Sequence, residues 1–566
     1  MPSWISDSGR SARGSIVWIV LVSLALMLPA LLFERMLAGD SHIHIHWQSQ
    51  FGSLVWSSTP YPRWLPDMNY RFGSPAFFFY PPLLQWTGAL FAPIFPGPAN
   101  ATMRISLALW ALSAAGGLGC WYWVRAMGLR GAAPLLAALA YVLMPYRSYF
   151  DIYQRGALPE LAGISVMPWL LCFAQRLKIG TPGAWGGYAL SVALILYSHL
   201  PAAEMGLIYA TCYVLVLADR TDWLRFLLKA GTATIAGFMA SALCIATALG
   251  LLKYIPNPTN MWGDRNQPVH WLLFSHERWQ DPGVYVVVVA LFAFTCVTSL
   301  ALGAVSRRIE SPMNRKIAWF LVISTLVILV LNMEPTRFFW AAQTPLSRIQ
   351  FPFRLFSLTV LALSGLGALA FAHLQDKGFL GAARLRALAL GGFLLGLLFI
   401  DVALFAVHAW HSRGHPPLNN AEILAEDTDT GEYVIGDIKL VRARFGDAAY
   451  LPLQGEVSAK TTTWDSRHIS FDLLAKGEAV VALRQFAFTG WKCRIDGGAW
   501  QAPQSLPQPL NLPTCAVPPG QHRLDAVLDK TPVERVGGWL TLFGLLIALA
   551  DVAGVTRRLG KRPAAA

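Results

Sequence analysis

The chain has 566 residues, and its composition is 55% hydrophobic with only 14% charged residues, against about a quarter charged in an ordinary soluble domain. This composition excludes a single soluble domain, because many nearly charge-free runs are long enough to cross a bilayer as helices. The net charge of +13 is spread over separate loops and not gathered on one basic face, so it does not indicate nucleic-acid binding.

The first apolar run, 15–37, follows a basic segment and ends at Glu34-Arg35, where a cleaved signal peptide would carry small residues. We therefore expect a retained membrane anchor. Further crossings are expected at 104–124, 131–147, 160–178, 184–199, 201–218, 229–252, 284–304, 314–332, 355–374, 386–408 and 536–556. The pattern predicts a mainly α, polytopic bundle of about 12–13 spans. The apolar segment 83–96 is short for a span, and we expect it to dip into the membrane or lie on its surface.

Lysine and arginine recur in alternate loops between these spans, as the positive-inside rule describes. The alternation predicts that both termini are cytoplasmic and that the first long loop, 38–82, faces the other side. For a bacterial chain this means a multi-pass protein of the inner membrane with its functional surface on the periplasmic side.

Residues 409–535 differ in character from the rest, because charged residues become common and short stretches alternate between apolar and polar positions. Alternation punctuated by glycine and proline turns is typical of a β-sandwich or small barrel. We therefore expect three regions: a transmembrane module at 1–408, an external β domain at 409–535, and a last transmembrane helix with a cytoplasmic tail at 536–566. Cys493 and Cys515 lie in the external domain, and the sequence leaves open whether they are bonded.

The loop 38–82 begins with a carboxylate at the membrane boundary, Asp40, followed by alternating histidines. A carboxylate in this position can act as a general base toward an incoming hydroxyl, or it can be a solvated residue at a helix end. His42 and His46 would share a face of a helix and could bind a divalent metal. No second cluster of ligands completes a site, so interfacial polar residues are the other interpretation and no cofactor is certain.

Further along the same loop, aromatic and proline residues gather between 62 and 82, together with Arg63, Asp67 and Tyr80. Aromatic rings with polar edges favour the bilayer interface, and the same rings can stack on sugars. Composition does not separate these two uses.

The loop 146–160 carries Arg155 and Glu160, and two other loops at the same membrane level carry His199 and Arg354. Charged groups at the mouth of a helical bundle are costly unless they are paired or wetted, so they indicate function. Arg155 and Glu160 could form a structural ion pair. Alternatively, the planar fork of Arg155 could receive a phosphate.

Several of these motifs together resemble a group of bacterial membrane proteins called "6-pyruvoyl-tetrahydropterin synthase-related", a name that does not imply pterin chemistry. The motifs are Gly39-Asp40, Pro-Arg-Trp-Leu-Pro-Asp-Met-Asn-Tyr at 62–70, Phe-Phe-Phe-Tyr-Pro-Pro at 77–82, Pro-Tyr-Arg at 145–147, Tyr-Gln-Arg-Gly-Ala-Leu-Pro-Glu at 153–160, Ser198-His199, and Gln-Phe-Pro-Phe-Arg at 350–354. Gly-Trp-Lys at 490–492 and Val-Pro-Pro-Gly-Gln-His at 517–522 resemble the external domain of YfhO-type proteins.

Both groups resemble the C-type glycosyltransferase superfamily, whose members are multi-span enzymes that use polyprenyl-phosphate sugars outside the cytoplasm. The resemblance implies an inverting glycosyltransferase with Asp40 as general base and a glycan, lipid or protein as acceptor. It makes Asp67 a second acid and Arg155 and Arg354 candidates for the donor phosphate, with Arg63, Tyr80, Glu160 and His199 as further substrate-binding residues. Two alternatives stay open: a transporter or flippase for a lipid-linked glycan, and a non-catalytic assembly factor of the cell envelope.

Overall fold

The computed structural model of the chain describes residues 9–255, 267–275, 279, 281–342, 344–379, 383–411, 418–425 and 428–555. Long helices make up most of it: α1 Gly9–Leu32, α6 Ala101–Ala126, α7 Ala133–Leu143, α8 Leu158–Lys178, α9 Ala184–Leu196, α10 Leu200–Leu217, α11 Trp223–Ala240, α12 Ala242–Leu251, α13 Pro282–Ser306, α14 Pro312–Leu331, α16 Phe356–Asp376, α17 Ala383–His411 and α20 Pro532–Val552. The fold class is therefore the mainly helical one that the sequence predicts.

Each crossing predicted from the sequence coincides with one of these helices, with α11 and α12 together forming one of them. Within the described residues, eight helices are long and apolar enough to cross a membrane, or nine if the pair α11 and α12, bent by 65°, is one span. This is fewer than predicted because three of the predicted crossings are too short: α7, α9, and in α17 an apolar stretch that covers only Gly391–Val407. Met144 is extended and precedes Pro145, a residue pair that disfavours helix, so α7 ends there.

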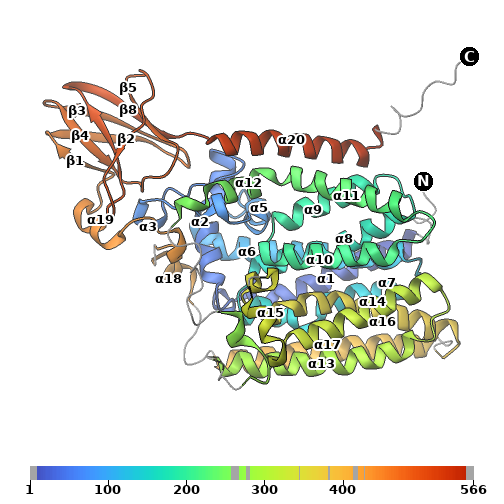
Figure 1. Cartoon of the computed structure of the whole chain (residues 1–566). Helices are drawn as coiled ribbons and strands as arrows, with labels where there is room; N and C mark the ends of the chain where they lie inside the picture. Colours follow the sequence, from blue (N-terminus) through green and yellow to red (C-terminus); the bar gives the residue numbers. More distant parts are fainter. Residues whose placement is uncertain are drawn as a thin grey trace, which may run out of the picture.

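The chain is thus a multi-pass membrane protein whose helices run side by side in one bundle (Figure 1). The segment 83–96 contains α5, Leu83–Ala89, whose seven residues are too short to span a bilayer. The β strands lie at one end of the bundle, and the C-terminal end of α20 lies at the other (Figure 1).

Short elements gather at the end of the bundle that carries the strands (Figure 1). They are α2 Ser41–Ser57, α3 Met68–Arg71, α4 Ala76–Phe79, α15 Arg337–Ala341, α18 Asn420–Ala425 and α19 Ile438–Phe445. Between α7 and α8 the chain forms a π-helix, Tyr146–Gln154. Such helices are rare and occur often at functional sites.

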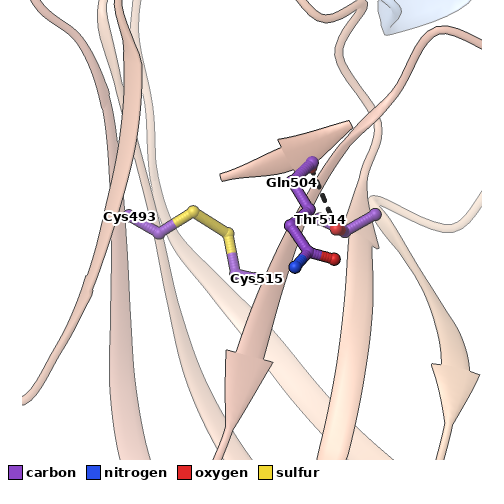
Figure 2. The surroundings of a disulfide bond; sticks show 4 residues. All are labelled: Cys493, Gln504, Thr514 and Cys515. Atoms are coloured by element: carbon purple, nitrogen blue, oxygen red, sulfur yellow. Dashed lines mark hydrogen bonds between the residues drawn. A yellow bond between two sulfur atoms is a disulfide. The ribbon is translucent and has the colours of Figure 1, made fainter. Parts of the chain in front are cut away.

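The strands form a sandwich of two four-stranded sheets, ordered β1-β4-β7-β6 and β2-β3-β8-β5, in which every neighbouring pair is antiparallel. Their bounds are β1 Tyr450–Gln454, β2 Val457–Trp464, β3 His468–Ala475, β4 Ala479–Leu483, β5 Trp491–Ile495, β6 Gln504–Ser505, β7 Pro513–Val517 and β8 Gly520–Leu528. Cys493 on β5 and Cys515 on β7 are bonded, so the disulfide links the two sheets (Figure 2).

The aromatic segment 62–82 packs against this sandwich and not against open solvent. Trp64, Phe72 and Phe77 are completely buried, and they share one hydrophobic cluster with sandwich residues such as Phe471 and Phe486. The backbone N–H of Phe486 donates to the carbonyl of Phe72 at 2.6 Å. The aromatic segment is therefore the surface on which the β-sandwich docks, a use different from the bilayer interface and the sugar stacking that composition left open.

Candidate functional site

Two tight turns interlock at the strand-bearing end of the bundle and bring distant parts of the chain together. The backbone N–H of Asp40 donates to the carbonyl of Arg155 at 2.9 Å. Gly39 and Gly156 both have positive φ, +56° and +64°. A Cβ at Gly39 would lie 1.9 Å from the carbonyl oxygen of Arg155, and one at Gly156 would lie 2.1 Å from that of Ala38. Only glycine fits at either position, so both turns need it to bring Asp40 beside Arg155.

Asp40 directly precedes α2 and is exposed, while its carboxylate does not cap the helix. The carboxylate therefore faces solvent at the bundle mouth. It also lies close enough to the hydroxyl of Tyr80 to act on it electrostatically. Burial of Tyr80, followed in size by the negative charge of Asp40, raises the pKa of that phenol above its usual value of 10.

Behind this turn lies a buried ion cluster, here called the mouth cluster, formed by Asp151, Arg155, Glu160 and Arg354. Arg155 Nη1 lies 2.8 Å from Asp151 Oδ1 and 3.1 Å from Glu160 Oε2, and Arg354 Nε lies 3.1 Å from the same Glu160 oxygen. Both carboxylates are fully buried. The tyrosine hydroxyl of Tyr146 donates to Glu160 Oε1 at 2.7 Å. The π-helix supplies Asp151, the first turn of α8 supplies Glu160, and Arg354 comes from the 3₁₀ turn Pro352–Leu355.

Aromatic rings form the wall of the mouth cluster. The guanidinium of Arg155 lies 5.0 Å from the centroid of the Phe353 ring and 5.5 Å from that of Phe351. Arg354 lies 5.0 Å from the centroid of Phe351. Cations over ring faces are attracted electrostatically, and more strongly where water is excluded. The motif 350–354 therefore supplies both an arginine and the rings that hold two guanidiniums in place.

Asp151 is the less fully hydrogen-bonded of the two carboxylates in the mouth cluster. Burial raises the pKa of Asp151 well above its usual value of 3.8, and the nearby Glu160 raises it further. Asp151 Oδ2 is buried and has no hydrogen-bond partner among the described residues. Burial therefore favours the protonated form of Asp151, while the guanidinium of Arg155, 2.8 Å away, favours the charged form.

Two histidines, the buried His44 and the half-buried His199, border the mouth cluster. His44 on α2 packs against Trp47 and Tyr80, with ring centroids 5.4 and 5.8 Å apart. Burial, with His42 as a smaller cause, lowers the pKa of His44 to about 3. Burial and the positive charges of Arg354 and Arg155 hold the pKa of His199 well below 6.5. The Nδ1 atoms of both rings are buried without a hydrogen-bond partner among the described residues, so two neutral imidazoles are available to a ligand.

Two of the predicted site residues lie apart from Asp40. Asp67 accepts a hydrogen bond from Trp464 on β2 at 2.9 Å, and its backbone N–H donates to Gln50, ten residues along α2 from Asp40. Ten residues of helix correspond to about 15 Å. Arg63 is buried, with Nη1 lying 3.6 Å from Glu534 at the start of α20. Asp67 and Arg63 thus hold the β-sandwich in place.

His42 and His46 lie one turn apart on α2, as the helical interpretation predicts. No group of three His, Cys, Asp or Glu side chains that could hold a metal is found in the part of the chain that the structure describes. His42 Nδ1 instead pairs with the carbonyl of Gly39 at 2.9 Å, which ties this ring to the Asp40 turn.

Sequence reasoning did not select Asp151, Tyr146, His44 or Asp429. Asp151 stands four residues before Arg155, a spacing that pairs charges on one helical face and was available as a signal. His44 lies four residues after Asp40 and could have been found in the same way. Asp429 carried no local signal, because it reaches the site only through the return of the chain after α17. There Asp429 Oδ1 accepts from Trp47 Nε1 at 3.0 Å.

No family model matches this chain, and the search of curated proteins gives no match. Among solved structures, the chain is similar to the arabinofuranosyltransferase AftD from Mycobacteria, with 18% identity, a TM-score of 0.44, and coverage of 71% of this chain and 27% of AftD. ArnT from Cupriavidus metallidurans bound to undecaprenyl phosphate shows 14% identity and a TM-score of 0.40, with coverage of 74% and 78%. The Archaeoglobus fulgidus oligosaccharyltransferase in its apo form shows 14% identity and a TM-score of 0.33, with coverage of 78% and 58%. This chain thus spans about a quarter of the length of AftD, and likenesses at this level assign no substrate.

Proposed function

We propose that the chain is a membrane glycosyltransferase that moves a sugar from a polyprenyl-phosphate donor to an acceptor outside the cytoplasm. The observation that carries the proposal is the interlock of the Gly39-Asp40 and Arg155-Gly156 turns, because it puts a solvent-facing carboxylate beside a buried pair of guanidiniums. The resemblance of the sequence motifs to C-type glycosyltransferases supports the same activity.

In the proposed reaction, Asp40 takes the proton of an acceptor hydroxyl as the oxygen attacks the anomeric carbon of the donor. The bond from that carbon to the phosphate oxygen breaks, and polyprenyl phosphate leaves with the bonding electrons. Attack from the face opposite the leaving group inverts the anomeric configuration. Asp40 ends protonated and returns its proton to water.

The mouth cluster would stabilise the departing phosphate. It places the guanidiniums of Arg155 and Arg354 beside the Asp40 turn, and guanidiniums suit the negative charge that builds on a leaving phosphate. Arg354 Nε has no hydrogen-bond partner among the described residues, although Glu160 lies 3.1 Å away, so its N–H is poorly aligned with the carboxylate. A phosphate oxygen could take that N–H. Tyr80 and His199 would contact the donor beside it.

We place the strand-bearing end of the bundle outside the cytoplasm. The opposite end carries the basic residues Arg125, Arg176 and Lys178 in the last turns of α6 and α8, as the positive-inside rule expects of a cytoplasmic face. The mouth then opens to the periplasmic side of a bacterial inner membrane, where lipid-linked donors and envelope acceptors meet.

The test is turnover of a panel of polyprenyl-phosphate sugars by purified protein in nanodiscs, read as release of polyprenyl phosphate. We expect release from at least one donor and no release by Asp40→Asn. Equal release by wild type and Asp40→Asn would refute the assigned base. No release from any donor, together with translocation of a lipid-linked glycan by the same nanodisc protein in liposomes, would make the chain a transporter.

A further inference from the structure

A cavity of about 170 Å³ lies beside the Asp40 turn, between α2 and the chain that returns to it after α18. Its walls include His42 and His46 from one face of α2 and Asp429 and Thr430 from the returning chain. At about 30 Å³ for each water of the liquid, this space corresponds to roughly six water molecules. It has room for one small ring but not for a chain of sugars or a lipid tail.

The polar groups of this cavity accept hydrogen bonds. The Nδ1–H of His42 donates to the carbonyl of Gly39 at 2.9 Å, which leaves Nε2 of this tautomer as an acceptor. Asp429 is held in place by donors from Trp47 and from its neighbour Thr430, whose backbone N–H lies 2.8 Å from Oδ1, and by the hydroxyl of Ser74. Three donors do not exhaust the lone pairs of a carboxylate, which offers about four sites.

Thr430 adds an unsatisfied group to the same wall. Its hydroxyl is buried and has no hydrogen-bond partner among the described residues. A buried hydroxyl without a partner costs free energy, and a ligand that bonds to it recovers that cost. The remaining wall is apolar and includes Ile43, Trp47 and Met68. An apolar face with an indole on one side and hydrogen-bonding groups on the other matches the two faces of a sugar ring.

The charges of the wall exclude other ligand classes. No lysine or arginine is among the described residues that line the cavity, while Asp429 would repel a phosphate or a carboxylate. A metal ion is disfavoured too, since the described residues bring no three suitable ligands together. The wall therefore suits a neutral ligand rich in hydroxyl donors.

We propose that this cavity binds one neutral sugar ring during the transfer reaction, with its hydroxyls bonded to His42, Asp429 and Thr430. The proposal rests on the proposed function. It deepens that function, because the ring lies beside the turn that holds Asp40 and is joined to it through the bond from His42 to Gly39. The ring can belong to the acceptor or to the donor, and its chemistry is the same in both.

The first experiment measures binding of a panel of methyl glycosides, each with one sugar ring, by saturation-transfer NMR on the full-length protein in nanodiscs. The test variant is Thr430→Val, which keeps the shape of the side chain and removes only the hydroxyl. Loss of one neutral hydrogen bond should weaken binding roughly two- to tenfold. Asp429→Asn should weaken it by more than about tenfold, since bonds to a charged group are stronger. Thr462→Val, at an exposed position of β2, is the matched control and should bind as wild type does.

Binding of no glycoside, or equal binding by wild type and Thr430→Val, would overturn the sugar site. The binding assay needs no turnover. The experiments can therefore refute the sugar-binding cavity and the glycosyltransferase function independently. Glycoside binding that Thr430→Val weakens, without release of polyprenyl phosphate from any donor, supports the cavity and refutes the transferase. Donor turnover with no effect of Thr430→Val on the KM for donor or acceptor refutes the cavity alone. A raised KM for the acceptor assigns the ring to the acceptor, and a raised KM for the donor in acceptor-free hydrolysis assigns it to the donor.

Discussion

Two buried arginine clusters lie at the same end of this bundle and use the same chemistry in different surroundings. The mouth cluster borders the exposed Asp40 turn and two neutral histidines with unpartnered Nδ1 atoms. The second, here called the docking cluster, consists of Arg63, Arg467 and Glu534. Arg467 Nη2 lies 2.5 Å from Glu534, and Arg467 also donates to the carbonyl of Leu528 on β8.

The difference separates a candidate binding site from a contact that only holds parts of the protein together. The docking cluster joins the first loop, the β-sandwich and α20, and Arg63 donates onward to the carbonyl of Leu243. Its members join parts of the protein to each other, although Arg63 Nη1 has no hydrogen-bond partner among the described residues. The mouth cluster lies beside the exposed Asp40 turn and includes two such atoms, Asp151 Oδ2 and Arg354 Nε. Motif resemblance selected Arg63 and Arg155 alike, and only the contacts of each side chain separate them.

The largest expected effect comes from removing the central carboxylate of each cluster. Glu160→Gln removes the carboxylate that Arg155 and Arg354 share and leaves Arg155 with Asp151 alone. Glu534→Gln removes the carboxylate that Arg63 and Arg467 share. Each change should lower the free energy of unfolding by about 3 kcal/mol. Thermal unfolding in nanodiscs measures both. Per folded molecule, donor turnover should be lost in Glu160→Gln and kept in Glu534→Gln. Turnover that falls equally in both variants would end the distinction between the clusters.

Breaking the disulfide should affect the β-sandwich alone. Cys493 and Cys515 are 22 residues apart, and closing a loop of that length in the unfolded chain corresponds to about 3 kcal/mol of stabilisation. Cys493→Ser should therefore increase hydrogen exchange in the sheet strands and leave the exchange of α8 unchanged. Cys212→Ser, which removes an exposed free cysteine on α10, is the control and should change neither. Unchanged exchange in the sandwich of Cys493→Ser would show that the bond does not stabilise it.

Lowering the pH should change the free energy of unfolding in opposite directions through His44 and through Asp429. The pKa of His44 falls from 6.5 to about 3 on folding, so the unfolded chain binds the extra proton and stability is lost as the pH drops below 6.5, by roughly 1.4 kcal/mol per pH unit. The pKa of Asp429 rises from 3.8 to about 6, so this carboxyl stabilises the fold at low pH and loses that contribution as the pH rises through 6. Between about pH 4 and 6, the two contributions to the free energy of unfolding therefore change with pH in opposite directions.

His44→Gln removes the contribution of His44 to this pH dependence and keeps that of Asp429. Thermal stability of the variant, relative to wild type, should then rise as the pH falls from 6 to 4, because only the contribution of Asp429 remains. A variant whose stability follows the wild-type curve over this interval would contradict the assignment of His44 as a buried neutral ring.

The smallest effect is expected at the hydrogen bond between Trp464 and Asp67. Trp464→Phe removes the indole N–H that Asp67 accepts at 2.9 Å on the surface. Stability should fall by no more than about 1 kcal/mol, and donor turnover should be unchanged. A fall in turnover of tenfold or more would give Asp67 the substrate role that the motif suggested.

The sequence was sufficient for the class of fold, because each charge-free run that predicts a crossing coincides with a helix. It did not predict how short α9 is, because the apolar run continues to Tyr197 while the helix ends at Leu196, and the chain is extended at His199 before α10 begins. The bond between Cys493 and Cys515 could not be read from spacing, because it depends on two sheets facing each other.

The candidate site was only partly predictable for the same reason. Arg155, Glu160 and Arg354 carry charge where charge is costly, so sequence reasoning selected them, and the structure brings them together. Asp67 and Arg63 are charged too, but their partners Trp464 and Glu534 lie about 400 residues later in the chain, a long-range pairing that a local pattern does not encode. Asp429 was missed because its burial comes from the same return of the chain.

The most direct test of the account compares two aspartates of one loop in one assay, Asp40→Asn and Asp67→Asn. Both side chains are exposed, so both variants should fold and unfold as wild type does. We predict that release of polyprenyl phosphate falls by at least about 100-fold in Asp40→Asn, the effect of losing a general base, and stays within about twofold of wild type in Asp67→Asn. Full turnover by Asp40→Asn in a protein that cleaves the donor would contradict the central claim.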